Sequence, residues 1–186
     1  YALIINAAGD QIIESCQVRY PLDVVSGLTA EEQQQFHRVV GLVVGRIGES
    51  EVNKSRCLIQ DNLIDGKLLP RAVSPVQMMV QRNWIRASTH GSLLLPLHAE
   101  SECTIRQNVI QGQYGIAMYS RGPESTAATA GRYVIASNLI DVESTPFWAF
   151  GPEKDREDRK ALSQLATIQN NIIRSKMHFG LQLVAE

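Results

Sequence analysis

Residues 102–120, with the sequence ECTIRQNVIQGQYGIAMYS, contain a pattern that recurs along the chain. A β-branched residue stands three positions before an Asn, and another stands two positions after it. Five copies align on the Asn: CLIQDNLI (57–64), MMVQRNWI (78–85), CTIRQNVI (103–110), YVIASNLI (133–140) and ATIQNNII (166–173). All ten of the β-branched positions are Ile or Val, which is typical of strands that fill a packed core. A sixth, weaker copy fits residues 12–18 if Cys16 takes the place of the Asn.

The distance between successive Asn residues indicates how the copies are arranged. It grows from 21 to 33 residues along the chain, so the unit has a minimum near 21 residues and is lengthened by insertions. Such a repeat predicts a solenoid, in which each unit stacks on the next. Strand alternation would bury the Asn, and a buried amide without a partner costs a few kcal/mol. Stacked about 4.8 Å apart, the amides satisfy one another and the backbone of the turn, which predicts a ladder of Asn side chains.

With this ladder, the chain resembles the right-handed parallel β-helix (pectate-lyase-like) superfamily over residues 1–26 and 41–186. The resemblance implies an all-β solenoid of about six coils, each with three strands. In that family the Asn ladder marks the tight turn between the second and third strands. By analogy, residues 103–107 are a second strand, 109–111 a third strand, and 115–120 the first strand of the next coil.

Length and composition favour one domain over residues 1–186, because 44% of the residues are hydrophobic and 20% are charged. Residues 27–41 are predicted to contain a short inserted helix, since a capping box starts at Thr29; the alternative is a charged loop. Two further insertions, 120–131 and 151–162, are expected to be loops. The chain begins with Tyr and stops in mid-coil, so we expect it to be part of a longer protein whose neighbouring sequence or a further subunit covers the solenoid end.

Charge and cysteine content exclude several classes of function. The net charge of −1, from 18 basic and 19 acidic residues, gives no field that attracts nucleic acid or an anionic membrane. No apolar run reaches the roughly 20 residues of a membrane span. Cys57 and Cys103 share a column two coils apart, about 9.6 Å by strand spacing, so they cannot form a disulfide. We expect free, buried cysteines.

The first-strand face is the candidate functional site, because the resemblance implies a glycan groove there, walled by the loop insertions. If Ile116 and Met118 point inward, alternation points Ala117 and Tyr119 outward. The outward positions, the acids of the adjoining loops and the roles that the resemblance implies give the set of candidates: Arg121, His98 and Tyr119 as catalytic residues, and Arg71, Trp148, Phe150, Glu124 and Glu153 as substrate-binding residues. Aromatic rings beside polar groups suit sugars, which present both C–H faces and hydroxyls. The alternative is that these aromatic residues are ordinary surface residues, or that Trp148 and Phe150 pack under the insertion at 151–162.

Whether the protein is an enzyme stays open. Glycoside hydrolysis needs two carboxylates at a defined separation, but no outward position on this face is Asp or Glu. The resemblance implies, for a lyase, a basic proton abstractor, often with calcium; no cluster of acidic residues for calcium is found on the face. We therefore predict no cofactor; the alternative is calcium, for which the sequence shows no ligand cluster. If the protein is an enzyme, it is a polysaccharide lyase or a glycoside hydrolase.

Two functional hypotheses follow. The first is a carbohydrate-binding or carbohydrate-processing domain, extracellular, periplasmic or on a virion surface, with a polysaccharide or oligosaccharide as partner. The second is a non-catalytic solenoid segment of a larger cell-surface or phage tail protein, which self-associates or contacts a neighbouring domain at its ends. The residues that directly follow each Asn form an apolar row, and an exposed row of this kind would support the second hypothesis. Its members are Leu63, Trp84, Val109, Leu139 and Ile172. We expect this row to turn into the core; the alternative is an exposed contact surface.

Overall fold

A computed structural model describes residues 3–6, 10–18, 40–47, 55–72, 76–97, 101–120, 132–150, 166–176 and 182–184. All secondary-structure elements in these ranges are β-strands, and every strand pairing is parallel. Within the same ranges, no helix has the length and apolar character that crossing a membrane requires. The strands form two sheets, as predicted for an all-β chain with parallel strands.

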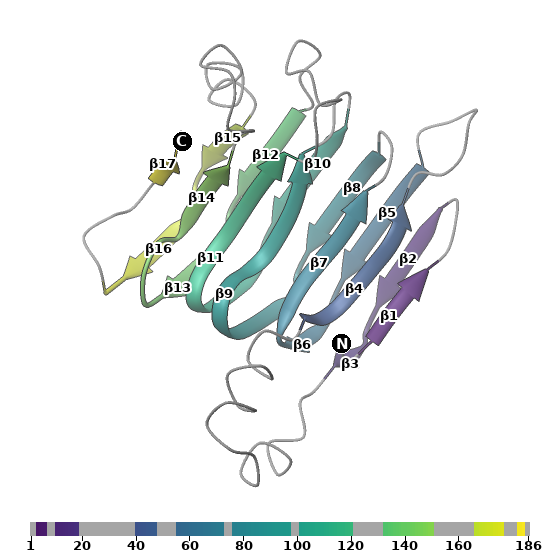
Figure 1. Ribbon diagram of the computed structural model, residues 1–186, viewed down its shortest axis with the longest axis horizontal. Helices are drawn as coiled ribbons and strands as arrows, with labels where there is room; N and C mark the ends of the chain where they lie inside the picture. The colour runs from purple at the N-terminus through teal and green to yellow at the C-terminus, as the bar shows by residue number, and fades with distance from the viewer. Residues whose placement is uncertain are drawn as a thin grey trace, which may run out of the picture.

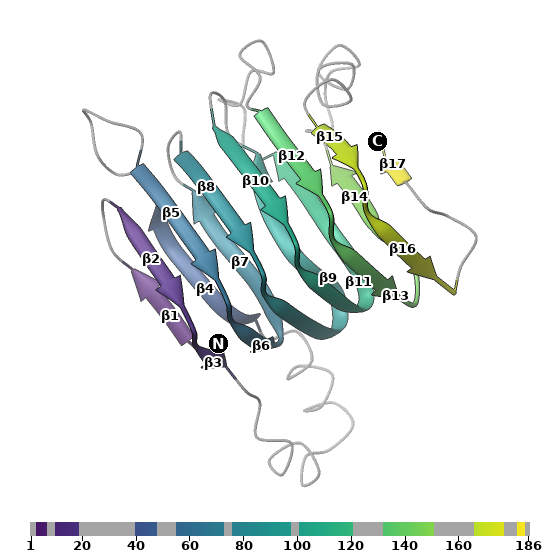
Figure 2. The same cartoon turned by 180° about the vertical axis from the view of Figure 1, so that it is seen from behind.

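The smaller sheet takes one strand from each copy of the repeat (Figure 2). Its spatial order is β15 (Ala166–Gln169), β12 (Arg132–Ala136), β10 (Glu102–Arg106), β8 (Val76–Gln81), β5 (Ser55–Gln60) and β2 (Gln11–Glu14). The repeat stays in register across the sheet, so that Ile105 lies between Val80 and Ile135. Ile13 pairs with Ile59, which confirms the sixth copy.

The larger sheet has eleven strands (Figure 1). Its main path is β1 (Leu3–Asn6), β4 (Val40–Ile47), β7 (Lys67–Ala72), β9 (Trp84–Leu97), β11 (Val109–Ser120), β13 (Leu139–Val142) and β16 (Ile172–Ser175). Four shorter strands join it at the side: β14 (Phe147–Phe150) pairs with β11, β17 (Gln182–Val184) with β14, β6 (Leu63–Asp65) with β9, and β3 (Gln17–Val18) with β6.

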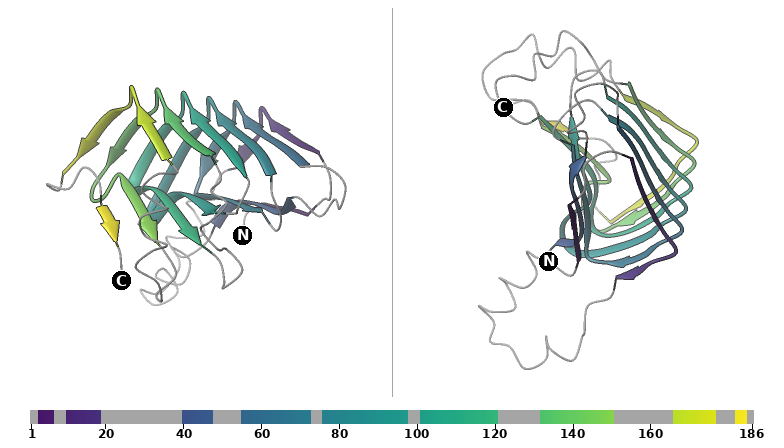
Figure 3. Two further views of the ribbon diagram at one scale, coloured as in Figure 1. Left: turned by 90° about the horizontal axis from the view of Figure 1, so that it is seen from above. Right: turned by 90° about the vertical axis from the view of Figure 1, so that its right-hand side faces the viewer.

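Two long strands, β9 and β11, bend (Figure 1), and each pairs with different strands at its start and further along its length. The start of β11 pairs with β13 and its end pairs with β14, with a register irregularity between Gly112 and Tyr114. The predicted third strand at 109–111 and the predicted first strand at 115–120 are therefore parts of one continuous strand. Seen from the end, successive repeats lie behind one another (Figure 3). This arrangement is compatible with a parallel β-helix.

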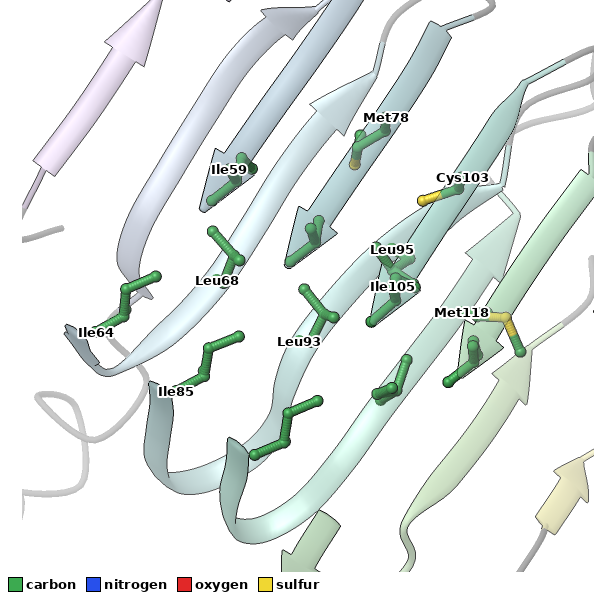
Figure 4. Close-up of a cluster of buried hydrophobic side chains, with 14 of the residues drawn as sticks. Ile59, Ile64, Leu68, Met78, Ile85, Leu93, Leu95, Cys103, Ile105 and Met118 are labelled. Atoms are coloured by element: carbon green, nitrogen blue, oxygen red, sulfur yellow. The ribbon is translucent and has the colours of Figure 1, made fainter. Parts of the chain in front are cut away.

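The buried core lies between the two sheets (Figure 4). It contains the repeat's β-branched residues from both sheets, and several of them are completely buried: Ile59, Ile64, Val80, Ile85, Ile105, Ile110, Ile135 and Ile140. Each fully buried side chain of this kind contributes roughly 1.5–3 kcal/mol. The repeat pattern thus predicts the core.

The Asn ladder is present, and Asn62, Asn83, Asn108 and Asn138 are only 1–2% exposed. Asn108 shows how each step is satisfied. Its Nδ2 donates to Val80 O at 2.9 Å and to Asn138 Oδ1 at 3.0 Å. Its Oδ1 accepts the Asn83 N–H at 2.9 Å and Asn83 Nδ2 at 3.0 Å. The amides therefore bond to one another and to backbone, as predicted.

The residue before each ladder position adopts the left-handed backbone conformation, with φ between 52° and 57°. The six residues are Ser15, Asp61, Arg82, Gln107, Ser137 and Asn170. This conformation costs an L-residue about 1–2 kcal/mol. The hydrogen bonds of the ladder offset that cost, because they hold each turn in place.

Two glycines are required where β11 passes its neighbours. A Cβ on Gly112, whose φ is +149°, would lie 2.0 Å from Ala87 O. A Cβ on Gly115 would lie 2.1 Å from Pro146 O. Both oxygens belong to the backbone, so neither can move aside for a side chain.

The three cysteines are free, and Cys57 and Cys103 are buried. Both pair with Met78, which stands between them in the column and keeps them apart, as predicted. Burial raises the pKa of the Cys57 thiol to about 12. Burial, followed by the nearby Cys57, raises the pKa of the Cys103 thiol to about 12.

The predicted insertions fall almost wholly outside the described residues. Of the helical insertion at 27–41, only Val40 and Gly41 are described, and both belong to strand β4. Of the loops at 120–131 and 151–162, only Ser120 is described, as the last residue of β11.

Candidate functional site

The candidate face consists of the positions on β7, β9, β11 and β14 that alternate with core residues. Leu93, Ile116 and Phe147 are paired across β9, β11 and β14, and each is at most 1% exposed. Because successive residues of a strand point to opposite sides, this core row fixes which positions belong to the other face. Trp148 directly follows Phe147, so its position belongs to the candidate face.

The strand register brings three predicted aromatic positions together. Tyr119 pairs with Phe150 on one side and with Pro96 on the other. Trp148 pairs with Ala117 and with Gln182. Paired strands lie about 4.8 Å apart, so the backbone positions of Tyr119, Phe150 and Trp148 are neighbours although they come from two different strands.

The other predicted site residues are placed less completely. Arg71 lies on β7, and continuing the Leu68–Leu93 register along the strands puts it level with Pro96 and hence in the row of Tyr119. Four residues lie outside the described residues: His98, Arg121, Glu124 and Glu153.

One position on the face differs from the expectation. Ala117 was expected to point outward to solvent, but it is only 2% exposed. Ile116 and Met118, on either side of it, were expected to point inward, and both belong to the core. The face is therefore covered at Ala117 and is not an open surface along its whole length.

Lys67 is a residue of this face that the sequence did not single out. It precedes the fully buried Leu68 at the start of β7, on the same side of the strand as Arg71, and it is itself a buried residue. Burial lowers the pKa of its amine. The backbone positions of Lys67 and Arg71 are four residues apart, about 13 Å along the strand.

Across the described ranges, no group of three or more His, Cys, Asp and Glu side chains is arranged to hold a metal ion. The described positions of the face include the aromatic Tyr119, Trp148 and Phe150 and the cationic Arg71. Such a set of residues suits the binding of a ligand with apolar faces and hydroxyl or acidic groups.

A second surface feature lies on the turn side of the molecule. We name it the post-Asn row; its members are Leu63, Trp84, Val109, Leu139 and Ile172, paired one to the next. The expectation that this row turns into the core was wrong, because none of the five is buried, and Trp84 and Ile172 are 46% and 62% exposed. The turn at each Asn does not change the strand's alternation, so the alternative prediction of an outward row is correct.

Trp84 is held in place on this surface by polar neighbours. Its indole Nε1 donates to Gln111 Oε1 at 2.8 Å, and the Arg86 guanidinium carbon lies 5.3 Å from the ring centroid. Arg86 in turn donates to Asp65 Oδ1 at 2.7 Å. A cation over a Trp ring contributes about 0.5–1 kcal/mol at an exposed site. The ring is therefore fixed in orientation while part of it contacts solvent.

Charged side chains flank the post-Asn row. Arg82 donates two hydrogen bonds to Asp61, each of 2.7 Å. This hydrogen bonding, aided by the positive charge, holds the pKa of Asp61 below its usual value. Lys176 bonds Glu143 at 2.9 Å, which raises the pKa of the amine. Each of these ion pairs joins two successive repeats, and both are exposed. They are therefore interpreted as a solvated surface and not as groups for acid–base catalysis.

The sequence matches no protein-family model, and no curated protein or solved structure is significantly similar to the chain.

Proposed function

We propose that the protein is a right-handed parallel β-helix of about six coils that binds a polysaccharide or oligosaccharide along the candidate face. The observation that carries the proposal is the register that makes Tyr119 and Phe150 direct neighbours, with Trp148 two residues from Phe150 on the same strand. Aromatic positions at strand spacing form a platform, and sugar rings stack on such platforms through their C–H faces.

A cationic position supports the same proposal. Arg71 lies on β7, in the row of Tyr119. Its charge suits a glycan with carboxylate groups, because arginine recognises carboxylates in a bidentate manner. Uronic-acid polymers are therefore the preferred ligand class. Binding at a cell or virion surface, or in the periplasm, is part of the proposal, as is catalysis by Arg121, His98 or Tyr119.

A panel of neutral and uronic-acid polysaccharides tests the proposal, with binding measured by calorimetry and cleavage measured by unsaturated and reducing-end products. Tyr119→Ala and Trp148→Ala are expected to weaken binding at least tenfold. Trp84→Ala is the matched control, because it removes an exposed aromatic ring from the turn side of the molecule. If no glycan binds, or if Tyr119→Ala and Trp148→Ala bind the glycan as tightly as Trp84→Ala does, the proposal is wrong.

A second candidate is a non-catalytic structural segment of a larger assembly. It is favoured by the exposed post-Asn row, because monomeric proteins rarely expose a continuous apolar stripe. Mass measurement in solution tests it: self-association that Trp84→Lys abolishes would support it, and a clean monomer would argue against it.

A further inference from the structure

The last repeat, around Asn171, makes only part of the hydrogen bonds that the other steps of the ladder make. Asn171 accepts the Asn138 N–H and Asn138 Nδ2, both at 2.9 Å, and its own Nδ2 donates to Ile135 O at 2.8 Å. These bonds all reach back to earlier repeats.

Each interior step of the ladder uses the same three kinds of bond toward the next repeat. The residue before the Asn donates its N–H to a strand-end carbonyl, as Ser137 does to Gln169 O at 3.2 Å. The Asn donates its backbone N–H and Nδ2 to the next amide oxygen, as Asn108 does to Asn138 Oδ1 at 3.0 Å. The Asn carbonyl accepts the next post-Asn N–H, as Asn138 O accepts from Ile172 at 2.8 Å.

Within the described part of the chain, none of these bonds toward a following repeat is made from Asn170 and Asn171. By the pattern of the interior steps, the groups that would bond to a following repeat are the N–H groups of Asn170 and Asn171, one Nδ2 hydrogen of Asn171 and the Asn171 carbonyl. The complementary surface is therefore defined atom by atom: a strand-end carbonyl, an amide or carboxylate oxygen, and one N–H.

The core is open at the same end. Ile168 and Ile173 continue the buried columns of Ile135 and Ile140, yet they are 36% and 41% exposed. At the other end of the ladder, Ile13 and Val18 hold the equivalent positions and are only 5% and 6% exposed. The two ends therefore differ, and only the end at Asn171 combines exposed core residues with unused ladder donors.

The geometry points to one occupant for this end: a polypeptide segment that adds two short strands parallel to β15 and β16 and places an Asn or Asp oxygen on the donors of Asn171. The added strands would cover Ile168 and Ile173 with β-branched residues of the same template. This docking surface does not depend on the proposed glycan binding, which concerns a different face.

The first repeat of a second copy does not fit as the occupant. It carries Cys16 in the ladder position, and a thiol offers no amide oxygen to the donors of Asn171. Head-to-tail stacking of identical chains would thus leave the ladder interrupted at the junction.

A synthetic peptide with the sequence of residues 132–142, RYVIASNLIDV, tests the inference against the intact chain. The matched control is the same peptide with Asn138→Leu, which keeps charge and length. Binding is measured by fluorescence anisotropy, and amide hydrogen exchange is followed by NMR. The Asn peptide is expected to bind at least tenfold more tightly than the Leu peptide and to slow exchange at Asn170 and Asn171.

Three results would overturn the inference: no binding of the Asn peptide, equal binding of both peptides, or binding that leaves exchange at Asn170 and Asn171 unchanged. The free protein gives an independent check, because these two amides should exchange much faster than that of Asn108. If they are equally protected without peptide, the end is already covered. Loss of glycan binding has no bearing on any of these readouts.

Discussion

Replacing Asn108 by Ala tests the central claim that the ladder, and not only the apolar core, holds the repeats together. Asn108 is 1% exposed and takes part through its side chain in four hydrogen bonds. After the change, Asn83 Nδ2 still donates to Ile59 O and Gln81 O, and Asn138 Oδ1 still accepts the residue-108 N–H. Two groups lose a partner: the Asn83 N–H loses its acceptor, and Val80 O loses a donor.

A buried polar group left without a partner costs about 1–3 kcal/mol. Two such groups therefore give a loss of about 2–6 kcal/mol in the free energy of unfolding, to which the small cavity adds. For a chain of this length, at about 2–4 °C per kcal/mol, that corresponds to a fall of roughly 4–24 °C in the melting temperature. Urea unfolding followed by circular dichroism measures the free energy, and calorimetry measures the melting temperature.

Asn171→Ala is the matched control, because it removes the same side chain at the last step. There the side chain is only partly buried, so water can replace some of the lost bonds, and the expected loss is about 1 kcal/mol. Equal losses for Asn108→Ala and Asn171→Ala would refute the reasoning, since burial of the ladder would then not determine its contribution.

Three further predictions concern the turns, the glycines and the thiols. Gln107→Val should lower the melting temperature by several degrees whereas Gln107→Asn should not, because a β-branched residue strains a backbone with φ of 56°; equal melting temperatures would contradict this. Gly115→Ala should destabilise the fold by at least about 2 kcal/mol in urea unfolding, since its Cβ would meet Pro146 O; wild-type stability would show that the strands can separate there. Stability should fall as pH rises from 9 toward 12, because the unfolded chain ionises its thiols first while burial keeps Cys57 and Cys103 protonated. Cys57→Ala should show a smaller fall over the same pH range in the same assay, and an equal fall would exclude the thiols as its cause.

The sequence predicts the ladder and the core because both depend on residue type at fixed spacing. Ile105, Asn108 and Ile110 carry that information by themselves, and each copy repeats it. The left-handed residues could not be predicted in this way. Arg82 and Gln107 do not favour that conformation, and only the bonds around them impose it.

The residues of the candidate site could be predicted from strand alternation, but the register that makes them neighbours could not. The pairing of Tyr119 with Phe150 depends on where β11 and β14 begin, and a four-residue strand such as β14 gives a weak signal. The exposure of Trp84 was misjudged for a related reason. A large apolar side chain at alternating spacing is compatible with either face, and the turn geometry decides between them.

The direction of the ladder has an electrostatic consequence. Every amide from Asn62 to Asn138 donates toward the following repeat and accepts from the preceding one. The side-chain dipoles therefore add instead of cancelling, and the column has a partial positive pole at Asn171 and a partial negative pole near Cys16. As at the ends of an α-helix, this polarity favours an anionic group at one end and a cationic group at the other.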